Sequence, residues 1–289
     1  MELNIVSLAL LGWIPACAAL FLFFRPVRAL TLAYLVGWLL LPVDALEIKG
    51  FWDVDKILAT NFGVILGTVL FCPWRFRLFR FNVPEAILLI YASGTILTSL
   101  TNGLGIYDGV SSFTYRVFYT AVPFCFGRAF VRSREDLMEI ARIIVAGASV
   151  CALLAIWEWR MSPHIHKTLY GYFQHSFHQH MRWGFFRPII CFKHALGLGT
   201  FFAWTSLLAI AMYRAGELRL RTAFRLPPSA ATLYVILPVI GLLTGMSLGP
   251  WGLFVIGIGI FVYRTQGRWR RLVWAPIVLA IGWMGGRYC

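Results

Sequence analysis

The chain has 289 residues, of which 60% are hydrophobic and 13% are charged, and its formal net charge is +14. A soluble domain usually carries about 25% charged residues, so this composition excludes an ordinary soluble protein. The apolar residues fall in blocks of about 17–25, the length that crosses a hydrocarbon core as a helix. Strict alternation of apolar and polar residues is absent, which argues against a barrel. The sequence therefore predicts an all-α, polytopic transmembrane bundle of about ten helices.

In chain order, the apolar blocks predict a single transmembrane domain, residues 1–289, without a soluble domain or an internal repeat. The first block lacks a basic flank and is too long for a cleaved signal peptide. The short turn at Ser247–Pro250 predicts a tight hairpin of the eighth and ninth spans. The predicted spans are Asn4–Phe24, Ala29–Leu46, Ile57–Pro73, Val83–Leu100, Ser111–Phe130, Leu137–Trp159, Ile189–Tyr213, Ala230–Met246, Trp251–Tyr263 and Leu272–Gly286.

The positions of lysine and arginine predict the orientation, because basic residues gather in cytoplasmic loops. Five alternate loops hold sixteen of the 26 basic residues, and the loops between them hold eight. The N-terminus is therefore expected to face outward from a bacterial inner membrane. The arginine-rich loops lie at 25–28, 75–80, 128–134, 214–225 and 264–271.

The net charge needs no nucleic-acid partner, because basic residues beside anionic headgroups account for it. Arginines alternate with aromatic residues in the segment Trp74–Phe81, and such a pattern also occurs in single-strand binding surfaces. An interfacial anchor is the better interpretation, since both residue types favour that depth. The six cysteines show no paired spacing and are interpreted as small apolar residues.

The loop at 160–188 is the exception to the short loops, and it is expected to face outward (periplasmic). All six histidines of the chain fall between His164 and His194, among several basic residues. Ser162, Pro163 and Gly171 predict a short helix there, as cap, first residue and end. The positive charge of this loop opposes the orientation rule, so we expect it to serve a function.

The residue types of this loop suit the transfer of a group from a diphosphate to a hydroxyl. Arginine binds phosphate with two parallel donors, and histidine accepts a proton near neutral pH. Arginines would neutralise the departing diphosphate while a histidine removes the hydroxyl proton. Arg116, in the fifth span, is expected to join them, since an intramembrane arginine usually faces a cavity or a partner.

Other interpretations of these residues stay open. Basic residues of the loop could contact only lipid phosphate, and any single histidine could serve structure alone. This alternative applies to Arg160, Lys167, Arg182 and Arg187. A zinc site from His175, His178 and His180 is the weaker alternative, because their spacing fits no metal motif. Glu158 could orient a histidine or an arginine.

Several short motifs between about Asp108 and Pro250 resemble the O-antigen ligase and O-antigen polymerase superfamily of bacterial membrane glycosyltransferases. The similar branch consists of exopolysaccharide polymerase-like proteins. The pattern shared most widely is an arginine followed by a histidine before a glycine-rich span. The motifs are Phe113-x-Tyr115-Arg116, Pro123-Phe124-x-x-Gly127-Arg128, Met161-Ser162-Pro163, Tyr170-Gly171-Tyr172, His175-Ser176-Phe177, Arg187-Pro188 and His194.

The resemblance implies a GT-C-like helical fold and a metal-independent, inverting glycosyl transfer without a cofactor. The implied donor is a glycan on undecaprenyl diphosphate, and the acceptor is a glycan or a lipid-linked glycan at the outer face of the membrane. The implied diphosphate-binding residues are Arg116, Arg182 and Arg187. The implied catalytic base is His194, with His175 and His178 as the next candidates.

Some features depart from the family pattern and keep other functions open. The Ser-Arg-Gly element of the family is Ser247-Leu248-Gly249 here, and family members usually carry further spans. One alternative is a carrier or flippase for lipid-linked glycans, although carriers place charges near mid-membrane. Another is an inactive truncated homologue that acts as a scaffold.

Overall fold

The computed structural model describes residues 4–47, 52–78, 81–218 and 228–265, and the tenth predicted span lies outside these ranges. The fold is all-helical, as predicted, with two strands of two residues each. The helices are α1 (Ile5–Phe23), α2 (Pro26–Leu40), α3 (Lys56–Phe71), η1 (Pro73–Leu78), α4 (Val83–Thr101), α5 (Gly105–Arg116), η2 (Val117–Ala121), α6 (Val122–Phe130), α7 (Arg134–Met161), α8 (Ile165–Tyr170), η3 (Phe177–His180), α9 (Ala195–Arg214), α10 (Pro228–Thr244) and α11 (Leu248–Thr265). The strands are β1 (Met181–Arg182) and β2 (Phe185–Phe186).

Four of the described helices are long and apolar enough to cross a membrane, namely α1, α4, α7 and α9. The apolar helices α2, α3, α10 and α11 are shorter. Large apolar side chains cover the outside of the molecule, and Ile90, Leu97 and Val150 are all exposed. Such a surface would be a liability in water and suits contact with lipid. These features are compatible with membrane localisation.

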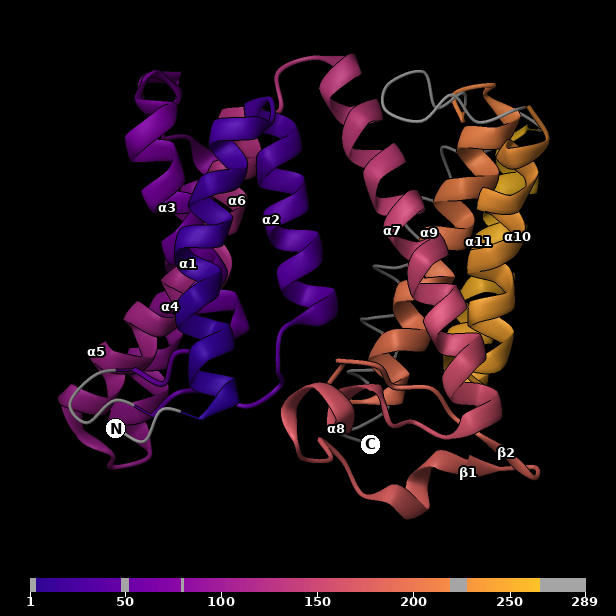
Figure 1. The fold of residues 1–289 in the computed structure, drawn as a ribbon. Helices are drawn as coiled ribbons and strands as arrows, with labels where there is room; N and C mark the ends of the chain where they lie inside the picture. The colour runs from indigo at the N-terminus through magenta and orange to yellow at the C-terminus, as the bar shows by residue number, and fades with distance from the viewer. Residues whose placement is uncertain (1–3, 48–51, 79–80, 219–227, 266–289) are drawn as a thin grey trace, which may run out of the picture.

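The helices form two groups, and α2 lies at the boundary between them (Figure 1). One group contains α1–α6, the other contains α7 and α9–α11, and α2 packs against α7 between them. Gly147 of α7 allows the close approach, because a Cβ there would lie 2.6 Å from Cδ2 of Leu35. Below we call these the N-terminal and C-terminal groups.

Small residues also bring α1 and α3 together within the N-terminal group. Gly63 and Gly67 of α3 are one turn apart and face Cys17 and Phe21 of α1. A Cβ on either glycine would lie within 2.6 Å of an α1 side-chain atom. This small-xxx-small spacing is the common way for membrane helices to pack, because it allows the backbones to approach closely.

Two predicted spans have the wrong limits. The second was predicted as Ala29–Leu46, but α2 begins at Pro26, where proline suits the first turn, and ends at Leu40. Leu41 precedes Pro42 and is extended, as a residue before proline prefers. The seventh was predicted as Ile189–Tyr213, but α9 begins only at Ala195.

The fifth predicted span, Ser111–Phe130, is one continuous helical path from Gly105 that contains a π turn at η2. The N–H of Val122 bonds to the carbonyl oxygen of Val117, five residues back. The next such bond would need an N–H on Pro123, which proline lacks. The buried amide of Asn61 replaces it by donating to the carbonyl oxygen of Phe118 at 2.6 Å.

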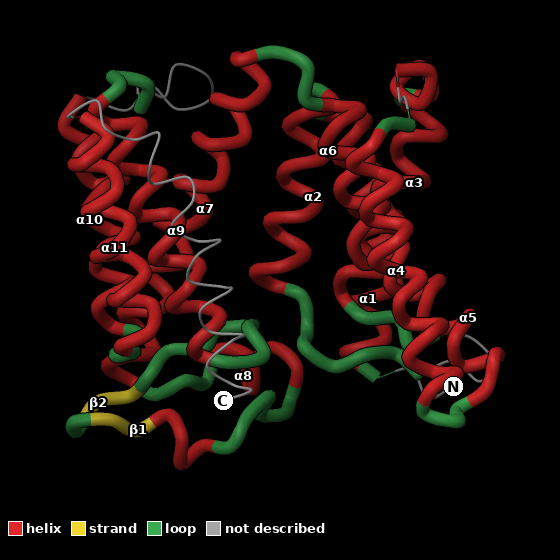
Figure 2. The backbone as a smooth tube through the Cα atoms, turned by 180° about the vertical axis from the view of Figure 1, so that it is seen from behind, coloured by secondary structure: helices red, strands yellow, loops and turns green. Residues whose placement is uncertain are grey.

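Residues 162–194, here called the histidine-rich segment, lie across one end of the molecule with α8, β1 and β2 (Figure 2). The start of α1 lies at this same end (Figure 1), as the predicted topology requires. The predicted short helix is present as α8, and Gly171 ends it with a φ of 85°. Ser162 does not cap it, because Ser162 ends α7 and His164 precedes α8. The predicted tight hairpin is present as α10 and α11.

Candidate functional site

The buried carboxylate of Glu158, near the end of α7, ties both ends of the histidine-rich segment together. One oxygen accepts the N–H of Ile165 at 3.1 Å, and the other accepts those of Ile189 and Ile190 at 2.8 Å each. Ile190 has a φ of 51°, a strained value for a β-branched residue. The two bonds to one oxygen stabilise this turn, and they explain why α9 does not begin at Ile189.

Three imidazole rings gather within this frame. The ring centroid of His175 lies 4.6 Å from that of His194 and 5.5 Å from that of His180. The backbone N–H of Arg187 donates to the carbonyl oxygen of His180 at 2.6 Å, which holds the arginine beside the rings. Among the described residues, no group of three or more His, Cys, Asp or Glu is placed to hold a metal ion.

Two arginines lie beside the imidazoles and are held by the turn between α10 and α11. Nε of the buried Arg187 donates to the carbonyl oxygen of Gly245 at 3.2 Å, and Nη1 of the exposed Arg182 donates to that of Met246 at 3.4 Å. A guanidinium has five N–H donors, so the exposed Arg182 keeps donors for a ligand, whereas Arg187 is 4% exposed. The structure therefore brings together His175, His194, Arg182 and Arg187 of the predicted site, and adds His180.

The surroundings favour the neutral form of His180 and of His194. Burial, His175 and the charge of Arg187 lower the pKa of His180, and burial, His175 and Arg187 also lower the pKa of His194. The carboxylate of Glu158 accepts three backbone N–H groups, so its hydrogen bonds go to the backbone and not to the imidazoles. The site thus combines fixed positive charge with neutral rings, which suits an anionic ligand and a proton acceptor.

The hydrogen bonds distinguish the candidate bases. Nδ1 of His194 accepts the N–H of Leu196 and caps α9, so the neutral ring carries its proton on Nε2 and donates there. Nδ1 of the buried His180 has no hydrogen-bond partner among the described residues. Nδ1 of His180 is therefore free to accept a proton, whereas the half-buried His175 beside it is the more accessible ring.

Two predicted site residues lie apart from this cluster. Arg116 lies on α5, and its guanidinium sits 5.8 Å from the ring centroid of Tyr91 on α4. The expectation that Arg116 joins the other arginines is thus not supported by its placement, because it faces a helix of the N-terminal group. His178 is exposed in η3, and the described part of the chain gives it no contact with the three rings.

His166 has a structural position instead. Its buried ring receives the N–H of Val43 on Nε2 at 3.3 Å and lies 3.1 Å from the carbonyl oxygen of Tyr172 through Nδ1. The hydroxyl of Tyr170 donates to the carbonyl oxygen of Leu40 at 2.7 Å. These bonds fasten the histidine-rich segment to the loop that follows α2, so they join the two helix groups at this end.

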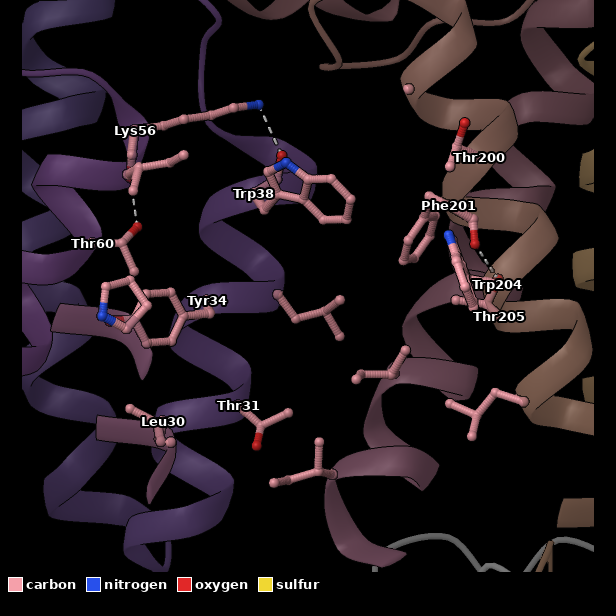
Figure 3. A pocket seen from close by; sticks show the side chains of 18 of the residues that line it. Leu30, Thr31, Tyr34, Trp38, Lys56, Thr60, Thr200, Phe201, Trp204 and Thr205 are labelled. Atoms are coloured by element: carbon pink, nitrogen blue, oxygen red, sulfur yellow. Dashed lines mark hydrogen bonds between the residues drawn. The ribbon is translucent and has the colours of Figure 1, made fainter. Parts of the chain in front are cut away.

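A large apolar cleft of about 1030 Å³ lies between the two helix groups. Figure 3 shows Tyr34 and Trp38 of α2 on one wall and Phe201 and Trp204 of α9 on the other. The cleft reaches Leu196 and Gly197 in the first turn of α9, the turn that His194 caps. The apolar cleft therefore comes within two residues of His194, although its lining contains no residue of the charged cluster.

The threonines of the cleft add little polarity to its walls. The hydroxyls of Thr31, Thr60, Thr200 and Thr205 each donate to a carbonyl oxygen of their own helix, at 2.7–2.8 Å. Their methyl groups are what remains to contact an occupant. Such a wall suits a long hydrocarbon chain.

Lys56 is the charged residue of the cleft lining, and it was not among the predicted site residues. Its Nζ donates to the carbonyl oxygens of Trp38 and Cys191, at 2.9 Å each, and so links α3, α2 and the histidine-rich segment (Figure 3). The sequence places Lys56 directly after Asp55, a residue that favours helix N-caps, and before an apolar run. This pattern indicates a lysine in the first turn of a membrane helix. His180 and Asn61 were also missed as key residues, and only the folded chain shows their partners.

The comparisons with known proteins found no similar protein. No family model, no curated protein and no solved structure matches the chain.

Proposed function

We propose that the chain is a polytopic membrane glycosyltransferase that polymerises or ligates glycans carried on undecaprenyl diphosphate. In this proposal it has about ten spans in a bacterial inner membrane, its N-terminus faces outward, and the histidine-rich segment lies at the outer surface. The observation that carries the proposal is that the apolar cleft reaches the first turn of α9, which is capped by His194 of the histidine and arginine cluster. A lipid-linked diphosphate has the same sequence of parts, a hydrocarbon chain followed by a dianionic group.

The proposed reaction is a direct displacement at the sugar. The acceptor hydroxyl oxygen forms a bond to the anomeric carbon, and the bond from that carbon to the diphosphate oxygen breaks with inversion. The diphosphate leaves with the electron pair, and Arg182 and Arg187 stabilise its charge. The hydroxyl proton passes to the imidazole of His180 or His175. Glu158 positions the segment that holds these groups.

Turnover by purified protein in proteoliposomes tests the proposal. The donor is an undecaprenyl-diphosphate glycan, and the acceptors are a lipid-linked glycan and lipid A core, in separate reactions. We expect product with one acceptor, and a loss of about 100-fold or more in Arg187→Gln, since removing one donor from such a site costs that much. Arg160→Gln, which changes an exposed arginine of the same region, is the matched control. Equal rates in the two variants would refute the assignment of Arg187.

A carrier for lipid-linked glycans is the second candidate, because the cleft lies between two helix groups. A smaller cleft of about 430 Å³ lies against the same α2–α7 contact, and Leu35 lines both. Relative movement of the groups would open one cleft at the expense of the other. Transbilayer movement of a fluorescent undecaprenyl-diphosphate glycan, without any acceptor, would favour the carrier, whereas transfer without such movement favours the enzyme.

A further inference from the structure

The hairpin of β1 and β2 carries a tryptophan where its backbone favours a different residue. Met181 pairs with Phe186 and Arg182 with Phe185, which leaves Trp183 and Gly184 as a two-residue turn. Both have positive φ, 51° and 79°, the pattern of a type I′ turn. Asparagine and glycine are the residues that favour this conformation, and a bulky side chain at its first position is strained.

Burial of the indole does not compensate for this backbone strain, because Trp183 is 67% exposed. Its described ring neighbour is Trp251 of α11, with the ring centroids 6.2 Å apart and the planes at 41°. The two indoles form an aromatic surface at the tip of the hairpin. The backbone of this hairpin lies below α10 and α11 in Figure 2.

Other contacts hold the hairpin in place, so the tip is not needed for its attachment. Phe185 stacks on Trp159 of α7, with centroids 4.5 Å apart and planes at 11°. Arg182 donates to Met246 in the turn before α11. The Trp183 indole is therefore presented on a fixed support, directly next to Arg182 in sequence.

We propose that the Trp183–Trp251 surface binds a pyranose ring of the glycan substrate. The face of an indole is electronegative, and the C–H bonds of a sugar carry partial positive charge, so the two stack. The N–H donors of Arg182 that Met246 does not use can bind sugar hydroxyls beside the stack. The inference rests on the proposed function only in taking a glycan as the substrate.

The test separates sugar binding from diphosphate binding by using two probes. One is an array of free bacterial oligosaccharides without lipid or diphosphate, and the other is undecaprenyl diphosphate without sugar. The full-length protein in nanodiscs is expected to bind members of the array. Trp183→Asn should lower that affinity about three- to tenfold, the typical contribution of one aromatic stack. Trp183→Phe should retain part of it, and Trp157→Leu, which changes an exposed tryptophan elsewhere, should retain all of it.

Trp183→Asn also tests whether the tryptophan serves structure. Asparagine suits the turn better, so the variant should have a higher Tm while it loses oligosaccharide binding. Undecaprenyl diphosphate binding should be unchanged in this variant. Unchanged oligosaccharide binding in Trp183→Asn would overturn the proposal and indicate a tryptophan that contacts only lipid headgroups. The absence of array binding by the unmodified protein would overturn it as well, whereas failure of undecaprenyl diphosphate to bind would count against the proposed function instead.

Discussion

Replacing Glu158 by glutamine should release the histidine-rich segment from the end of α7. The carboxylate accepts three backbone N–H groups, from Ile165, Ile189 and Ile190. Glutamine has nearly the same shape, but only one of its two terminal atoms accepts a hydrogen bond. If the amide oxygen keeps the bonds to Ile189 and Ile190, the amide nitrogen faces the N–H of Ile165, and two donors oppose each other.

The hydrogen bonds set the expected size of the effect. A bond to a charged acceptor contributes about 1.5–3 kcal/mol, and a neutral bond about 0.5–1.5 kcal/mol. Three charged bonds at about 2 kcal/mol become two neutral bonds at about 1 kcal/mol, and relief from burying a charge offsets part of the difference. We therefore expect the closed segment to lose about 3 kcal/mol relative to its opened form. Since about 1.4 kcal/mol is a factor of ten, the opened population should rise about 100-fold.

Hydrogen exchange measured by mass spectrometry checks this prediction on the peptide that covers residues 186–194. In Glu158→Gln its amides should exchange about 100-fold faster than in the unmodified protein. Glu139→Gln is the control, because Glu139 lies at the other end of α7 and pairs with Arg28. An unchanged exchange rate at 186–194 in Glu158→Gln would refute the view that this carboxylate holds the segment.

Three further predictions follow from the site and its surroundings. Asn61→Leu leaves the carbonyl oxygen of Phe118 without its donor in a buried position, so the protein should lose about 1–3 kcal/mol of stability, seen as a lower Tm in thermal unfolding. Transfer activity should fall as the pH is lowered from about 7 to 5, because protonated His180 cannot accept a proton, and the stability that comes from burying this ring in neutral form should fall over the same range. Burial is the main cause of the lowered pKa of His180, and the charge of Arg187 lowers it further. Removing this charge in Arg187→Gln should therefore shift the fall in residual activity to higher pH. A pH profile that does not shift would exclude His180 as the base. Thr200→Trp should fill the cleft and lower the affinity for undecaprenyl diphosphate at least tenfold while leaving that for a short-chain analogue unchanged, as measured by binding in nanodiscs.

The all-helical fold and the hairpin of α10 and α11 could be predicted from the sequence. Apolar block length and turn residues are local signals, and they are strong when the solvent is lipid. Helix limits were less predictable where side chains compete with the backbone. The start of α9 at Ala195 depends on Glu158, which is 37 residues earlier in the chain. No local sequence pattern reveals these hydrogen bonds.

The roles of single histidines could not be predicted, because they depend on which ring nitrogen has a partner. His166 looked like the others in sequence, yet its two ring nitrogens face Val43 and Tyr172. His194 was the first choice for the base, and its bond to Leu196 could not be foreseen without knowing where α9 begins. Arg116 was grouped with the loop arginines because only its depth was known, whereas its direction depends on the packing of α5 on α4.

The π turn at η2 has a consequence for how insertions and deletions act on this helix. A π turn holds one residue more than the α-helical path it replaces, and each residue of an α-helix turns the chain by about 100°. The wider turn absorbs the extra residue, so deleting one residue from Val117–Ala121 would restore regular winding and leave α6 with nearly the same faces. Pro123 and Gly127 would stay in the cleft lining, and Arg128 would stay near its ion-pair partner Glu85. Deleting one residue within α6 itself would instead rotate part of the helix by about 100° and disturb these contacts. The π turn is thus the place where this helix can lose a residue without rebuilding one wall of the cleft.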